Sequence, residues 1–180
     1  MSTTDLTTAP GASGRITDGA WQLDPTRSSV GFHVRHFYGL MTVKGEFADY
    51  DSRLNLVSTP AVELTLQAAS LHTKHAKRDE HVRSKDFFDV ERYPTFQVVV
   101  DKIGPVTADS NEVQVRATLT VRETVKPLTF IAHADRRADS VTLTATIPYV
   151  RADFGMTWNQ LGMMAGKGEI GVKLRFTRQG

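Results

Sequence analysis

The sequence VQVRATLTV, residues 113–121, alternates apolar and polar side chains without a break. Two later stretches repeat the pattern, VTLTATI at residues 141–147 and IGVKLRF at residues 170–176. Because successive side chains of a β-strand point to opposite faces, this period of two predicts strands with one buried and one solvated face. Such strands are typical of antiparallel sheets, since parallel strands are usually covered on both faces.

Weaker alternation occurs in four other stretches, which lie between residues 30 and 132. It runs through Val30/Phe32/Val34, Val62/Leu64/Leu66, Phe96/Val98/Val100 and Leu128/Phe130/Ala132, with Val99 and Ile131 as exceptions. About eight such strands without long helices between them predict an all-β protein, either a closed antiparallel barrel or a sandwich. The polar stretch KHAKRDEHVRS, residues 74–84, lacks the alternation and predicts a short helical insertion near residues 74–90.

Length and composition limit the domain organisation and the function class. The 180 residues suffice for one domain, which we expect over residues 21–180, after a flexible tail at residues 1–20 rich in Ser, Thr, Ala and Gly. A net charge of +2 argues against nucleic-acid binding, and the lack of cysteine excludes disulfides and thiolate metal sites. No apolar run is long enough to span a membrane or to act as a secretion signal, so we expect a cytoplasmic protein, with transient membrane contact left open.

Catalytic motifs are scarce, and we do not expect an enzyme. The sequence has no GxSxG and no GxGxxG, and the HxxH pair of His33 and His36 would point to opposite faces of a strand. One alternative is a metal-dependent enzyme that uses the region of His72, His75, Asp79 and His81. A second is a non-catalytic β-sandwich that serves as an interaction module, with a filled core and an exposed apolar patch.

Strand parity places two polar side chains on the apolar face. His36 continues the series Val30, Phe32 and Val34, and Arg151 continues the inward series after Ile147 if no bulge near Pro148 shifts the register. A structural interpretation pairs each with a backbone carbonyl or an acid, because buried charges need partners. A functional interpretation has both hold the polar head of a long apolar ligand at a cavity mouth.

Four ordered motifs resemble those of the YceI-like family of polyisoprenoid-binding proteins. They are Ser29-Val30/Phe32/Val34/His36/Val43/Gly45/Phe47, RDEHVRSKDFFDVERYP at residues 78–94, LTVRETVKPLTF at residues 119–130, and Arg151 with Asp153-Phe154-Gly155. The resemblance implies an extended, lipocalin-like antiparallel barrel and an isoprenoid ligand such as a polyprenyl phosphate or an isoprenoid quinone. It also implies a homodimer and no cofactor beyond the bound lipid.

The expected function is therefore a carrier, store or sensor of an isoprenoid lipid, which needs an apolar tunnel and no catalytic group. A segment rich in Met and Gly, residues 154–171, is a candidate lid over that tunnel, because thioethers adapt to irregular shapes and glycines allow motion. The predicted ligand-binding residues are Phe32, Val34, His36, Phe47, Leu64, Leu66, Phe96, Val98, Leu119, Phe130, Ile147, Arg151, Met156, Trp158, Met163 and Met164.

Overall fold

The computed structural model describes residues 20–55, 61–107, 110–159 and 162–178. Its first strand, β1, spans Ala20–Leu23. The tail expected at residues 1–20 therefore lies outside the described residues, except for Ala20.

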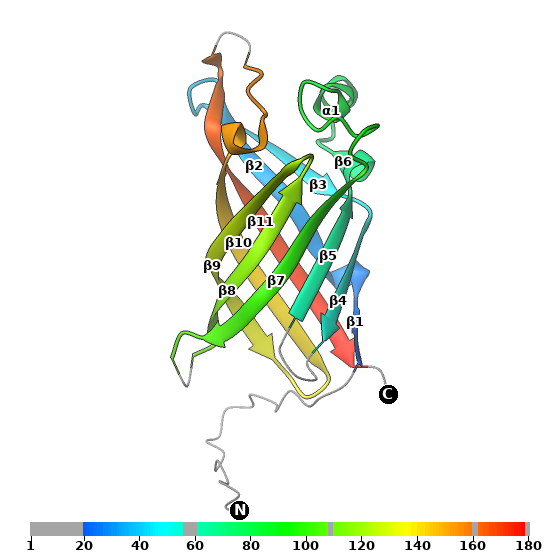
Figure 1. The fold of residues 1–180 in the computed structure, drawn as a ribbon, viewed down its shortest axis with the longest axis vertical. Coiled ribbons are helices and arrows are strands. Elements are labelled where there is room, and N and C mark those ends of the chain that lie inside the picture. Colours follow the sequence, from blue (N-terminus) through cyan, green and yellow to red (C-terminus); the bar gives the residue numbers. More distant parts are fainter. Residues whose placement is uncertain (1–19, 56–60, 108–109, 160–161, 179–180) are drawn as a thin grey trace, which may run out of the picture.

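Eight antiparallel strands close into a barrel (Figure 1). Around the wall they follow the order β1, β4 (Tyr50–Asn55), β5 (Ala61–Gln67), β7 (Thr95–Pro105), β8 (Glu112–Val121), β9 (Thr124–Arg136), β10 (Ser140–Val150) and β11 (Met164–Arg178). The pairing of β1 with β11 closes the ring, so every barrel strand has two neighbours at that level. The predicted all-β antiparallel barrel is confirmed, and the sandwich alternative is wrong.

Three more strands lengthen the wall at one end: β2 (Ser29–His36), β3 (Met41–Phe47) and β6 (Leu71–His72). Strand β11 pairs with β1 near its carboxyl end and with β2 along most of its remaining length. Between β1 and β2, the 3-10 turn η1 (Pro25–Arg27) interrupts the edge, and the Asp24 carboxylate accepts the Thr26 N–H. The result is an extended barrel, as the family resemblance implied.

The alternation along the strands decides which side chains fill the barrel. The inward residues of β8 are all buried, and so are Val141, Ala145 and Ile147 of β10. Leu174 and Phe176 of β11 are also buried. The exceptions in the pattern, Val99 and Ile131, are exposed apolar side chains on the outer face. Single apolar residues on a protein surface are ordinary and do not break the strand assignment.

The predicted helical insertion is present as α1 (Ala76–Arg83), shorter than the expected span of residues 74–90. His75 begins it by accepting the Arg78 N–H, and the Ser84 N–H ends it at the His81 carbonyl. Two 3-10 turns complete the fold, η2 (Ala68–Ser70) and η3 (Arg151–Phe154). In Figure 1, α1 and η3 lie at the same end of the barrel, opposite the end where β1 begins and β11 finishes.

Candidate ligand-binding site

The barrel encloses a cavity of about 440 Å³, a size ordinary for a ligand pocket. Side chains of β2, β3, β5, β7–β11 and α1 line it, and nearly all are aliphatic or aromatic. Its only titratable lining side chains, within the part of the chain described, are His36, Arg78, His81, Tyr149 and Arg151. These come from the end of β2, from α1 and from the β10–η3 junction, at the α1 end of the barrel. The cavity is thus apolar in its depth and polar at one end.

Most of the predicted ligand-binding residues meet in this lining. The cavity residues among them are Phe32, Val34, His36, Phe47, Leu64, Leu66, Phe96, Val98, Leu119, Phe130, Ile147, Arg151, Met156, Trp158 and Met164. Met163 is half-buried and does not line the cavity, which corrects its expected position. That any of them contacts a ligand stays a prediction.

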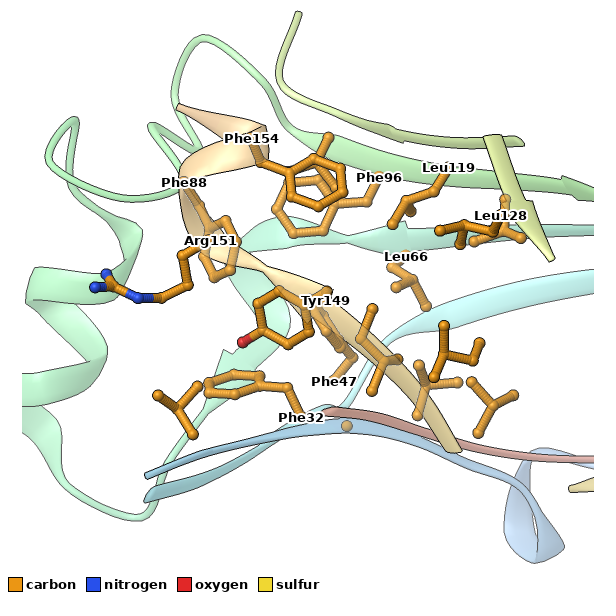
Figure 2. A pocket seen from close by; sticks show the side chains of 18 of the residues that line it. Phe32, Phe47, Leu66, Phe88, Phe96, Leu119, Leu128, Tyr149, Arg151 and Phe154 are labelled. Atoms are coloured by element: carbon orange, nitrogen blue, oxygen red, sulfur yellow. The ribbon is translucent and has the colours of Figure 1, made fainter. Parts of the chain in front are cut away.

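Aromatic rings surround the α1 end of the cavity. Phe96 contacts Phe47 edge-on with ring centroids 5.9 Å apart and Phe88 at 4.9 Å. The His81 ring of α1 stands edge-on to Trp158, at 4.3 Å, and to Phe87, at 5.1 Å. Such pairs hold large rings in fixed positions without polar contacts. Figure 2 shows Phe88 and Phe96 beside each other in the cavity lining.

Arg151 is the buried cation of the cavity, with only 5% of its surface exposed. Its Nε donates to the Ala165 carbonyl at 3.0 Å and its Nη1 to the Trp158 carbonyl at 3.2 Å. Within the described residues, no carboxylate lies within 4.0 Å of it. Burial lowers the pKa of this guanidinium from its ordinary value. The site therefore holds a desolvated positive charge that two neutral carbonyls stabilise only in part.

Two features of β10 and β11 bring Arg151 to the cavity. The pairing of the two strands runs in continuous register past Pro148, which pairs with Glu169, so the parity predicted for Arg151 holds. The irregularity lies instead in β11, whose pairing with β2 shifts between Met164 and Gly168. The Ala165 carbonyl lies within this bulge and accepts the Arg151 hydrogen bond.

Tyr149 lies two residues before Arg151 and faces the same cavity (Figure 2). Burial raises the pKa of its hydroxyl to about 12, although the nearby Arg151 opposes the shift. Gly168 makes room for the ring, since a Cβ there would lie 2.7 Å from the Tyr149 ring and hydroxyl atoms. Tyr149 is thus a neutral hydrogen-bonding group beside the buried cation at neutral pH.

Polar contacts fasten α1 over the end of the barrel. The Asp79 carboxylate accepts the Thr73 N–H at 2.7 Å and its hydroxyl at 2.5 Å, and Arg78 donates to the Thr73 hydroxyl and carbonyl. Arg83 donates to the Leu71 carbonyl. Burial opposes ionisation of Asp79, but the hydrogen bonds from Thr73 outweigh it and lower the pKa of this carboxyl. The helix has no fully buried residue, so these contacts, together with the packing of Val82 and the His81 ring, hold it in position.

The side chains of the histidine region proposed for a metal-dependent enzyme do not converge on one point. His75 caps α1, Asp79 binds Thr73, and His81 Nε2 lies 3.3 Å from Asp86 Oδ2. Across the ranges that the structure describes, no group of three or more His, Asp or Glu side chains could hold a metal ion. These polar side chains instead stabilise the helix or line the cavity.

The candidate lid at residues 154–171 is only partly a loop. Its second half is β-strand, because β11 begins at Met164; this corrects the expectation for residues 164–169, while residues 170–176 form the strand that their alternation predicted. In the first half, Met156 is buried, and the Asn159 side-chain amide bonds to the Met164 N–H and carbonyl. Residues 160–161 lie outside the described residues. The described part of this connection is therefore anchored to the barrel.

Several cavity residues were absent from the predicted set. Tyr149 could have been added by the parity argument that placed Arg151, because it lies two positions before Arg151 on the same strand face. Phe87 and Phe88 follow a polar helix, a context in which periodicity carries no signal. Phe37 and Met41 lie at the β2–β3 turn, where alternation ends, so strand pattern did not assign them either.

Comparisons with known proteins agree with the fold and the motifs. A UPF0312 protein of Photorhabdus laumondii is 34% identical over 103 residues, which cover 55% of this chain and 52% of that protein. A UPF0312 protein of Pseudomonas syringae pv. tomato is 35% identical over 106 residues, with 55% and 52% covered. The chain thus matches about half the length of these curated relatives.

Solved structures extend the comparison to the whole barrel. BcnA of Burkholderia cenocepacia superposes with a TM-score of 0.77 at 19% identity, covering 85% of this chain and 98% of that one. A polyisoprenoid binding domain from Saccharophagus degradans gives 0.74 at 16% identity, with 89% and 99% covered. Among the described residues no helix is long and apolar enough to cross a membrane. The YceI-like domain model matches residues 21–177, and the chain therefore belongs to the YceI-like family.

Proposed function

We propose that this protein binds an isoprenoid lipid, with the apolar chain in the barrel cavity and the polar head at the α1 end. A long chain with one polar terminus matches a cavity that is apolar in its depth and has its titratable groups at one end. Each methylene moved from water into such a site contributes about 0.8 kcal/mol. Several isoprene units then supply most of the affinity without specific polar contacts.

The observation that carries the proposal is Arg151. A guanidinium that is almost fully buried, without a carboxylate partner among the described residues, is a costly arrangement for a purely structural side chain. A phosphate or quinone oxygen at the same end would complete its hydrogen bonding, and the Tyr149 hydroxyl offers a second donor. The polyisoprenoid binding domain of Saccharophagus degradans has the same fold and supports this ligand class.

The role that follows is that of a carrier, store or sensor, which takes up and releases the lipid unchanged. Among the described groups at the α1 end, Arg151 donates to two backbone carbonyls, and the His81 ring packs against Trp158 and Phe87, an arrangement that favours binding over nucleophilic catalysis. We place this role in the cytoplasm, as the sequence led us to expect, and we retain the homodimer that the family resemblance implies.

The test is a binding titration with prenols of increasing length, followed by tryptophan fluorescence, because Trp158 lines the cavity. Affinity should rise with each isoprene unit until the chain fills the barrel. Val98→Trp places a large ring inside the cavity and should weaken binding of the longest prenol by at least about tenfold, since it displaces several methylenes. Val99→Trp, one residue along on the outer face, is the matched control and should bind like the parent.

The dependence of affinity on prenol chain length decides this experiment. Equal affinity for short and long prenols, or equal binding by the Val98→Trp and Val99→Trp variants, would show that the cavity does not take the chain.

A further inference from the structure

The turn between β2 and β3 exposes the largest apolar side chains at the α1 end of the barrel. Within residues 37–41, here called the β2–β3 tip, Tyr38 is 83% exposed and Leu40 is 87% exposed. Phe37 and Met41 flank them with 42% and 56% of their surfaces exposed. Soluble proteins rarely gather exposed large apolar residues in this way unless another surface covers them.

The tip has a defined conformation that presents these side chains. The Gly39 N–H donates to the His36 carbonyl at 3.2 Å, and the Leu40 N–H donates to the Phe37 carbonyl at 3.1 Å. Phe37 and Tyr38 have φ of 50° and 55°, in the left-handed region that bulky residues seldom occupy. Such angles cost energy at bulky aromatic residues, and residues strained in this way occur often at functional sites.

The tip is continuous with the cavity. Phe37 and Met41 belong to its lining as well as to the exposed surface, and His36, which precedes them, lines it too. Tyr38 and Leu40 are not part of that lining and are the most exposed residues of the tip. An apolar surface therefore leads from the exterior at the tip to the interior of the barrel. In Figure 1 this turn lies at the same end as α1 and η3.

Cations surround the same end. Arg35 on β2, Lys44 on β3 and Lys167 on β11 are exposed, and within the described ranges none of the three takes part in an ion pair. The segment 74–86, which contains α1, adds five Lys or Arg against three Asp or Glu. Exposed aromatic and aliphatic residues beside unpaired cations match the interface of an anionic bilayer, where rings enter the headgroup layer and cations meet phosphates.

We propose that the β2–β3 tip docks on an anionic lipid bilayer, so that the cavity mouth opens against the membrane. This inference rests on the proposed function, because a membrane is where an isoprenoid chain is dissolved. On docking, Tyr38 and Leu40 enter the headgroup layer, while Arg35, Lys44 and Lys167 approach lipid phosphates. Phe37 and Met41 then form an apolar path along which the chain passes without crossing water.

The test compares the parent with a Tyr38→Ser/Leu40→Ser double variant in sedimentation with vesicles. One set of vesicles is phosphatidylcholine alone, and the other is phosphatidylcholine mixed with phosphatidylglycerol. The parent should sediment with the anionic vesicles and lose binding as salt rises. The double variant should bind them at least about tenfold more weakly, because two apolar anchors are lost. A Val99→Ser/Val106→Ser variant, which removes two exposed apolar side chains away from the tip, should behave like the parent.

Prenol binding in solution, measured on the same variants, separates this inference from the proposed function. Both variants should keep the parent affinity, because Tyr38 and Leu40 lie outside the cavity lining. A parent that binds prenol but does not sediment with anionic vesicles overturns the docking and leaves the lipid-binding proposal standing. A parent that binds no prenol refutes the lipid-binding proposal itself.

Two further outcomes would also overturn the docking. Equal sedimentation with both vesicle types would remove the role given to the three cations. A parent dimer that the double variant converts to a monomer, without vesicle binding by either, would assign the tip to contact between two copies of the chain.

Discussion

Replacing Arg151 by Met removes the buried cation of the cavity while keeping a side chain of similar length. A guanidinium has five N–H donors, and the Ala165 and Trp158 carbonyls use two of them. Three donors remain for a ligand. In Figure 2 the Arg151 side chain points toward the side of the cavity where α1 lies, which is where we place the head group.

The size of the effect follows from these contacts. Loss of a charge-assisted hydrogen bond in a partly desolvated site costs on the order of 1.5–3 kcal/mol, or about ten- to a hundredfold in affinity. This loss applies to a prenyl phosphate, whose head group accepts the bond as an anion. A neutral prenol of equal chain length keeps its burial, so its affinity should change by less than about threefold.

Arg151→Met should lower the free energy of unfolding by less than the loss of two hydrogen bonds implies. The variant leaves two carbonyls without their donor, which costs about 1–3 kcal/mol each if water does not reach them. It also removes a desolvated cation, whose burial lowers its own pKa and opposes folding. We therefore expect a net loss of about 1–3 kcal/mol, with the barrel still folded.

The assay is a pair of titrations, prenyl phosphate and prenol, on the parent, on Arg151→Met and on Arg116→Met. Arg116 is an exposed cation on the outer face of β8 and serves as the matched control. Urea unfolding of each variant reports stability separately. If Arg151→Met weakens both ligands equally, or neither, then Arg151 only holds the Ala165 bulge and the head group is bound elsewhere.

Two further predictions concern the walls of the cavity. Gly168→Ala should lower the free energy of unfolding in urea by about 1–3 kcal/mol, because the new Cβ would meet the Tyr149 ring. Gly166→Ala, whose Cβ would have nothing within 4 Å, should stay within about 0.5 kcal/mol of the parent, and equal losses in the two variants would refute the close approach. Asp79 has a folded pKa below its ordinary value of 3.8, so its hold on Thr73 should be complete above that pH and disappear as the pH falls through the folded pKa. Prenol release by the parent should therefore accelerate only as the pH falls below 3.8. Asp79→Asn should release prenol fast at all pH values, and a variant that keeps the parent's pH profile would contradict this role for the carboxylate.

The strand pattern predicted the barrel interior because burial on one face imposes the period of two on the sequence. The parity argument placed Arg151 correctly, since the pairing of β10 with β11 continues unbroken past Pro148. Val99 and Ile131 interrupted the pattern without consequence, because they are single apolar residues on the outer face. These features depend on local order along one strand, which a sequence displays directly.

Features that depend on contacts between distant segments could not be predicted in this way. The bulge in β11 that supplies the Ala165 carbonyl leaves no sign in the alternation, and the glycines of residues 164–169 predict a loop where the structure has a strand. Gly168 is instead small because the Tyr149 ring covers it. The expected helical span of residues 74–90 also includes His75, whereas His75 lies before the helix as its cap. The bulge and the close approach at Gly168 were thus decided by partners on a neighbouring strand.

Native mass spectrometry of the purified protein, before and after organic extraction, tests the central claim most directly. The account predicts a bound mass that extraction removes, and the extract should contain a lipid whose fragments differ by whole isoprene units. Protein carrying Val98→Trp should retain less of this lipid than protein carrying Val99→Trp, because only the first ring occupies the cavity. A protein that purifies without lipid and takes up none from added prenols, or an extract that holds only straight-chain fatty acids, would contradict the claim.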